Sequence, residues 1–127
     1  MAVDYTPVYD ADGDPFTLTT SAAVTAGQVL VVSGSGTVGP SAGASAVAIG
    51  IAGSDAASGA RVMVYPLDAV HECVAAAGIT AGDGITSAAS GQVTTAVVGT
   101  AAAAGTLIGI ALTTATTGNK VRFVGRN

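Results

Sequence analysis

The chain has no tryptophan, only two phenylalanines and three tyrosines, and a single cysteine. One cysteine, Cys73, excludes the intrachain disulfides that hold many small secreted domains together. Charged side chains make up 9% of the 127 residues, whereas ordinary soluble domains contain about 25%. The four basic residues, in a chain of net charge −4, are too few to neutralise a nucleic acid or to bind an anionic membrane. We therefore expect neither nucleic acid nor a membrane as a partner.

Long hydrophobic runs are also missing. Residues 15–54 and 84–119 carry no formal charge, but Gly, Ser, Thr or Pro interrupts them every few residues. A membrane-spanning helix needs about 20 predominantly apolar residues in a row. The segment 1–14 has neither a positively charged start nor an apolar stretch, so it does not resemble a secretory signal. These patterns predict no membrane segment and no secretory signal.

Small and β-branched residues supply most of the apolar mass. The chain contains 27 Ala, 17 Val and 18 Gly but only 5 Leu. β-Branched residues favour strands, whereas helical cores rely on Leu and Met. High hydrophobicity with low net charge also argues against disorder. In a chain of single-domain length, this composition predicts an all-β fold built from thin, closely packed layers.

The sequence contains an internal repeat. Three pairs of segments match in the same order: 24–27 with 79–82, 49–52 with 108–111, and 59–64 with 118–123. The offset within the first pair is smaller by four than the offset within the other two, which implies four residues inserted in the second copy. The copies run approximately over residues 24–65 and 79–124. Each is too short for a domain and too long for a solenoid coil, so we expect two similar β-meanders that complete one shared barrel or sandwich.

Runs of β-branched residues bounded by Gly, Ser or Asn place the strands. The predicted strands are 16–20, 28–33, 46–52, 60–66, 69–75, 91–98, 106–113 and 120–125. Val62 and Val64 alternate with larger or polar residues, a period of two that is typical of a strand. Two alanine runs, 75–77 and 101–104, each predict a helical turn that is ended by the following glycine.

The N-terminal segment 1–15 differs from the rest of the chain and lies outside both copies. It holds four of the eight acidic residues, with Tyr5, Val8 and Tyr9 as the bulky groups. Such a segment adds little to a core, and tyrosines are enriched at interfaces. We therefore predict an N-terminal arm over residues 1–15, which docks on a partner, and a single β domain over residues 16–127.

The segment Gly34–Gly39 matches the G-x-G-x-x-G pattern of dinucleotide sites. Such a site needs a helix that begins at the third glycine and presents its backbone amides to the pyrophosphate. Residues 40–45 are too few and too interrupted by Pro, Gly and Ser to form a crossover helix. We interpret the segment as a β-turn.

The aspartates of residues 10–14 resemble the start of a calcium-binding loop. The EF-hand pattern requires Gly at the sixth position and a bidentate Glu at the twelfth. Those positions hold Pro15 and Ser21. The pattern favours a solvated acidic turn, and we predict no metal site.

His71, Glu72 and Cys73 place a base, a carboxylate and a thiol side by side. On a strand, Glu72 points away from its two neighbours. Zinc needs at least three protein ligands, and the chain has no second His or Cys. A Cys–His nucleophile pair remains open in principle but needs an activating environment. We expect a small core residue at Cys73 and a surface or interface residue at His71, with no catalytic residue and no cofactor.

A series of segments spanning nearly the whole chain has a distinctive order. The segments are 8–10, 16–19, 23–34, 36–38, 50–52, 59–62, 70–72, 79–83, 109–111 and 121–123. The Val-His-Glu step at 70–72, between the two copies, is the most characteristic of them. In this order the segments resemble the small head-decoration proteins of tailed phages, which are also called capsid cement proteins.

The resemblance implies a compact, tulip-like β-barrel that assembles as a trimer. Such trimers would lie on the outer capsid surface at three-fold and local three-fold positions, where they bridge adjacent major capsid proteins and stabilise the head. The protein would be made in the bacterial host cytoplasm. The resemblance offers no catalytic residue and places the arm at the capsid. The candidate contact residues are Val3, Asp4, Tyr5, Val8, Tyr9 and Phe16.

Other classes of function remain open from the sequence. A tail, fibre or surface-layer β-module would have a similar composition, and a ligand- or metal-binding barrel would need a site such as the acidic residues 10–14. An enzyme is the least favoured class, because the chain has few polar residues to build an active site and lacks the P-loop, G-x-S-x-G and H-E-x-x-H motifs. The sequence therefore predicts a structural protein whose partners are the major capsid protein and further copies of itself.

Overall fold

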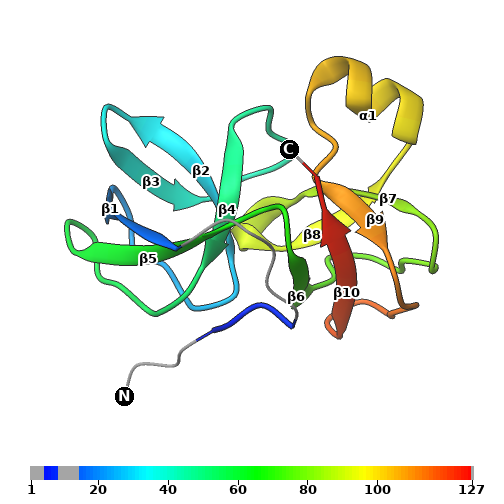
Figure 1. Cartoon of the computed structure of the whole chain (residues 1–127), viewed down its shortest axis with the longest axis horizontal. Helices are drawn as coiled ribbons and strands as arrows, with labels where there is room; N and C mark the ends of the chain where they lie inside the picture. The colour runs from blue at the N-terminus through cyan, green and yellow to red at the C-terminus, as the bar shows by residue number, and fades with distance from the viewer. Residues whose placement is uncertain (1–4, 9–14, 127) are drawn as a thin grey trace.

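The computed structural model describes residues 5–8 and 15–126. Within them the chain is mostly β-structure, arranged in two adjoining halves (Figure 1). The first half contains β1 (Phe16–Thr20), β2 (Val29–Gly34), β3 (Thr37–Pro40), β4 (Ala48–Ala52) and β5 (Arg61–Pro66). The second contains β6 (Val70–Val74), β7 (Gly84–Ser87), the 3-10 turn η1 (Ala89–Gly91), β8 (Val93–Ala96), helix α1 (Val98–Ala104), β9 (Gly109–Ala111) and β10 (Lys120–Gly125). The predicted all-β class is confirmed.

The first half is a closed barrel with the strand order β1-β3-β2-β4-β5. Strand β1 closes it by pairing on both sides. It is antiparallel to β5, with Phe16 opposite Val64, and parallel to β3, with Thr20 opposite Val38. Closure removes the unpaired sheet edges that would otherwise invite aggregation.

The second half repeats this topology. Its sheet has the order β6-β10-β9-β7-β8, which is the order found around the barrel when β1 to β5 are replaced in turn by β6 to β10. The segment that follows β6 meets β8 at a single parallel bridge between Ala75 and Val93. These two residues occupy the places that Thr20 and Val38 occupy in the first half.

Residue pairs correspond as closely as the strand order does. Ile51 lies opposite Tyr65 in the first half, and Ile110 lies opposite Val124 in the second. We call such residues counterparts. Up to β3, a residue and its counterpart in the second half are separated by four fewer sequence positions than they are from β4 onward. The four additional residues therefore fall in the connection that contains α1.

Each half has its own core, and the two cores use counterpart positions. The first core contains Leu18, Val24, Leu30, Val38, Ile49, Ala52, Ala56, Val62 and Val64. The second contains Cys73, Ile79, Ile85, Val93, Ile108, Ala111, Ala115, Val121 and Phe123. Val29, Ile51 and Leu67 also pack into the second core, although Val29 and Ile51 belong to strands of the first half. The second half is thus completed by side chains from the first.

Every predicted strand is present, and β3 and β7 are additional. The sequence does not predict these two short strands because their Gly, Pro and Ser residues are typical of turns. The alanine run 101–104 lies in α1, which ends at Gly105 in the left-handed conformation (φ 75°). The run 75–77 forms no helical turn, because Ala75 pairs with Val93 instead. In the segment Gly34–Gly39, residues 35 and 36 form the tight turn between β2 and β3, as the β-turn interpretation predicts.

The two halves do not complete one shared barrel. Strand β1 pairs with β3 and with β5, so the first half keeps no free edge for the second. Within the described chain, no strand of one half pairs with a strand of the other. The halves therefore meet mainly through side chains and connecting segments. We call the region where they meet the joint.

Candidate functional site

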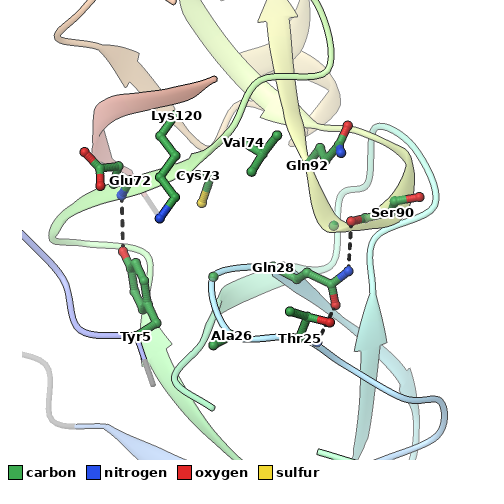
Figure 2. Close-up of a pocket in the computed structure, with 12 residues that line it drawn as sticks. Tyr5, Thr25, Ala26, Gln28, Glu72, Cys73, Val74, Ser90, Gln92 and Lys120 are labelled. Atoms are coloured by element: carbon green, nitrogen blue, oxygen red, sulfur yellow. Dashed lines mark hydrogen bonds between the residues drawn. The ribbon is translucent and has the colours of Figure 1, made fainter. Parts of the chain in front are cut away.

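Residues 5–8 lie at the joint, beside β6 (Figure 1), and Figure 2 shows Tyr5 there. Its backbone N–H donates a hydrogen bond to the carbonyl oxygen of Gly53, just after β4, at 2.8 Å. The N–H of Val8 donates to the carbonyl oxygen of Val70, at the start of β6, also at 2.8 Å. These two bonds attach residues 5–8 to both halves of the chain.

The side chain of Tyr5 is held by three neighbours. Its hydroxyl lies 2.6 Å from Nδ1 of His71 and accepts a hydrogen bond from the N–H of Glu72 at 3.2 Å (Figure 2). Its ring stacks on His71 with the ring centroids 5.9 Å apart, and it meets Tyr65 edge-on at 6.0 Å. Tyr65 belongs to the first half and His71 to the second, so one side chain packs against both.

His71 is completely buried, and the expectation that it lies at the surface or an interface is wrong. Its Nε2 lies 2.7 Å from the carbonyl oxygen of Pro66. A carbonyl oxygen only accepts, so in the neutral ring Nε2 carries the proton and Nδ1 accepts from the Tyr5 hydroxyl. Burial is tolerated because both ring nitrogens have partners. The strand pattern around His71 does not indicate that Tyr5 supplies one of them.

Cys73 is buried in the second core, as predicted. Burial raises the pKa of its thiol to about 12, and the nearby Glu72 carboxylate adds to the shift. Burial also raises the pKa of the Tyr5 hydroxyl above its ordinary value. A thiol that keeps its proton at neutral pH is a poor nucleophile. Cys73 therefore contributes packing here, and the chemistry of a Cys–His nucleophile pair is not supported.

A pocket of about 320 Å³ opens beside Tyr5 at the joint (Figure 2). It is lined by residues 25–28 of the first half and by residues 72–74, 90–92 and Lys120 of the second. Gln28 crosses it, because its side-chain amide donates a 3.0 Å hydrogen bond to the carbonyl oxygen of Ser90. In Figure 2 the amino group of Lys120 points into the open space beside Cys73. The pocket is therefore a gap between the halves, lined by both polar and apolar groups, that is bridged by a side chain of the protein itself.

In residues 5–8 and 15–126, no three His, Cys, Asp or Glu side chains are grouped so that they would hold a metal ion. The acidic residues 10–14, considered above as a calcium loop, lie outside the described residues. No helix of the described chain is long and apolar enough to cross a membrane.

The six candidate contact residues fall into two groups. Val3, Asp4 and Tyr9 lie outside the described residues. Of the others, Tyr5 is half-buried against its own chain, Val8 is half-buried, and Phe16 begins β1 with 43% of its surface exposed. The structure therefore gives Tyr5 an internal role that the sequence analysis does not predict.

The residues that face Tyr5 across the pocket were also missed by sequence reasoning. Gln28 and Ser90 are polar residues in segments rich in Ala, Gly and other small residues, and no motif marks them. Ser90 and Gly91 both have left-handed backbone conformations (φ 58° and 68°). A Cβ atom at Gly91 would meet the side chain of Gln28 at 2.5 Å. The Ser-Gly pair is thus the one sequence signal for this close approach.

Comparisons with known proteins agree with this architecture. The structure is similar to a crystal structure described as the head fiber gp8.5 N base in bacteriophage phi29, with a TM-score of 0.69 and 21% sequence identity. The match covers 99% of this chain and 95% of that chain, and at this identity it shows the fold alone. No curated protein sequence matches the chain. The profile of a family described as phage cement protein matches residues 8–126, which include both halves, and the chain therefore belongs to the phage cement proteins.

Proposed function

We propose that this phage capsid protein decorates the outer surface of the capsid and stabilises it by bridging adjacent major capsid proteins, as a trimer at three-fold and local three-fold positions. The observation that carries the proposal is the match to the phage cement proteins over residues 8–126. Cementing needs binding surfaces and no reactive centre, so the proposed role is structural and not enzymatic. Nucleic acid and membranes are not among the proposed partners, because the chain has only four basic residues.

The charge distribution supports the N-terminal segment as the capsid contact. Four of the eight acidic residues are Asp4, Asp10, Asp12 and Asp14. The remaining four acids are balanced by the four bases, so the net charge of −4 belongs to the segment 1–14. Concentrated charge steers association and fixes the register of two surfaces. The proposed partner surface is therefore a basic region of the major capsid protein.

The joint supports the same role, because it fixes where the segment leaves the body. Tyr5 and Val8 are hydrogen-bonded to the two halves, so the points at which the proposed contact residues join the described chain are fixed. A segment that is positioned in advance loses less conformational entropy when it binds. In this proposal Val3, Asp4 and Tyr9 contact the capsid together with the exposed part of Val8, and Tyr5 positions them.

Three such segments on one trimer would act together. Linked contacts can raise the overall affinity by factors of about 10² to 10⁴ when the geometry allows them to engage at the same time. The gain is lost when the binding sites are too far apart or too close. A trimer of this kind would bind tightly only to capsids whose subunits have the matching spacing, which is the physical basis of cementing.

The direct test mixes the purified protein with undecorated, expanded capsids and locates the added density by cryo-electron microscopy. The proposal predicts density on the outer surface at three-fold and local three-fold positions. Capsids that remain bare, or density elsewhere, would refute it. Co-sedimentation with the same capsids measures the affinity of variants.

Deletion of residues 2–4 tests the segment without disturbing Tyr5. We expect co-sedimentation to weaken at least about tenfold, the loss expected when linked contacts no longer act together, while the circular dichroism spectrum and thermal midpoint stay unchanged. Val97→Ser is the matched control, because Val97 is 73% exposed in the connection before α1 and should bind like the unchanged protein. Full affinity in the truncated protein would remove residues 2–4 from the contact.

A further inference from the structure

One outer face of the first half is buried at the joint. Val29, Ile51 and Tyr65 lie side by side across β2, β4 and β5. Their neighbours in sequence point into the first core, so these three point outward. Val29 and Ile51 have no exposed surface and pack with the second core, and the ring of Tyr65 meets Tyr5. The row formed by Val29, Ile51 and Tyr65 is therefore buried because the second half, which has the same topology, packs against it.

The counterpart row of the second half is covered only at one end, where Gly84 is buried beside Val98 and Leu107. It consists of Gly84, Ile110 and Val124, which pair in the same register. Val124 is 38% exposed, and Leu112, two residues beyond Ile110, is 50% exposed. On its other side Val124 lies opposite the half-buried Val70. We call Val70, Ile110, Leu112 and Val124 the second-half patch, an apolar surface whose members are partly or largely exposed.

In the joint, the second half receives the first on the side that carries His71, which we call the receiving side. The corresponding side of the first half, which carries Phe16, is exposed. His71 lies opposite Phe123, and its counterpart Phe16 lies opposite Val64. His71 is fully buried, with Tyr5 stacked on it, whereas Phe16 is 43% exposed. No aromatic ring of the described chain stacks on Phe16. Each copy of the protein thus presents the second-half patch on one side and the exposed Phe16 on another.

We propose that copies of this chain associate head to tail, with the second-half patch of one copy packed against the Phe16 side of the next. The contact would repeat between copies the joint that exists within each copy. The occupant is a second copy, because a half of this same fold covers the counterpart row. The inference rests on the proposed trimer and specifies its contact surface. It also assigns Phe16 to the contact between copies instead of the capsid. A head-to-tail contact closes into a ring when the rotation permits, and the proposed trimer requires that this one closes after three copies.

The test places one cysteine on each side of the contact. The double variant Phe16→Cys with Val124→Cys is treated with a short bis-maleimide, in solution and on decorated capsids. The natural Cys73 is buried and keeps its proton, so it does not react. We expect covalent dimers and trimers and nothing larger. The matched control is Val32→Cys with Val97→Cys, two exposed positions outside the proposed contact (46% and 73%), which should give several-fold less product.

The inference is overturned if the test pair cross-links no better than the control pair, or if the products continue past three copies. A second variant, Val124→Lys, should dissociate the trimer in light scattering without changing the circular dichroism spectrum, whereas Val32→Lys should not. A trimer that survives Val124→Lys also overturns it. Capsids decorated by a trimer without the 16–124 cross-link would refute this surface and leave the proposed function standing. A trimer that forms the cross-link but does not bind capsids would support this contact surface and refute the proposed function.

Discussion

The hydroxyl of Tyr5 lies 2.6 Å from Nδ1 of His71, although the two residues are 66 positions apart in the chain. The contact ties the start of the chain to the buried centre of the second half, where His71 also meets Phe123. The segment proposed to bind the capsid is therefore continuous with the core. A substitution at Tyr5 should therefore lower the stability of the protein directly, and weaken capsid binding as a consequence.

Removal of the Tyr5 hydroxyl should destabilise the protein. In Tyr5→Phe the ring still packs, but Nδ1 of His71 and the N–H of Glu72 each lose a hydrogen-bond partner. Leaving a buried polar group without a partner costs about 1–3 kcal/mol, so we expect the free energy of unfolding to fall by about this amount. Urea unfolding followed by circular dichroism measures it.

Tyr65→Phe is the matched control for this experiment. Tyr65 lies at the same joint, but its hydroxyl makes no hydrogen bond within the described chain. Its loss should change the free energy of unfolding by less than about 0.5 kcal/mol, as for most substitutions that remove no specific interaction. Equal losses in the two variants would show that the hydrogen bonds of Tyr5 do not stabilise the joint.

Stability should decrease in alkaline solution. Burial raises the pKa of Cys73 from 9.0 to about 12, and it raises the pKa of Tyr5 above its ordinary value too. Both groups hold their protons more tightly in the folded chain than in the unfolded chain. Their stabilising effect is therefore fully present below about pH 9 and is lost as the pH rises toward the folded values. Urea unfolding between about pH 8 and pH 11 should show a falling free energy, with a smaller fall in Cys73→Ala. An equally steep fall in that variant would exclude Cys73 as a cause.

Gly109→Ala should destabilise the second half. Gly109 lies opposite Gly125 in the β9–β10 pair, and an added Cβ would meet the carbonyl oxygen of Val124 and the ring of Phe123. Overpacking of this kind typically costs about 1–3 kcal/mol, and the thermal midpoint should fall accordingly. At Gly78, outside the strands, an added Cβ meets nothing within 4 Å. Gly78→Ala should therefore leave the midpoint unchanged, and a similar fall in both variants would contradict the steric explanation.

Much of the fold could be predicted because strand formation here depends on local pattern. Alternation such as that of Val62 and Val64 places one side of a strand in the core, as the buried pair confirms. The short strands β3 and β7 could not be predicted, because pairing with neighbours overrides the turn preference of their Gly, Pro and Ser residues. The closure of β1 against β3 depends on contacts between distant segments, which no local pattern records.

The joint could not be predicted for a related reason. Tyr5 has the features of an exposed interface residue in the sequence, and only the structure shows that Gly53 and Val70 accept the hydrogen bonds that fix its segment. The burial of His71 follows from the same long-range contact. By contrast, Cys73 could be assigned to the core, because a free cysteine is a small, apolar side chain that is usually buried.

Substitutions at Ile51 and Ile110 can distinguish the contribution of the joint to stability from that of local structure. They are counterparts in identical registers, opposite Tyr65 and Val124, but Ile51 is fully buried and Ile110 is partly exposed. Ile51→Ala should cost about 2–5 kcal/mol, as expected for a buried isoleucine, and Ile110→Ala should cost much less in a dilute, monomeric sample. If copies associate head to tail, the cost of Ile110→Ala should grow with protein concentration, because binding between copies stabilises only the folded form. Thermal unfolding over a concentration series measures this dependence. A cost that is independent of concentration would contradict the contact between copies, and equal costs at low concentration would contradict the role of Ile51 in the joint.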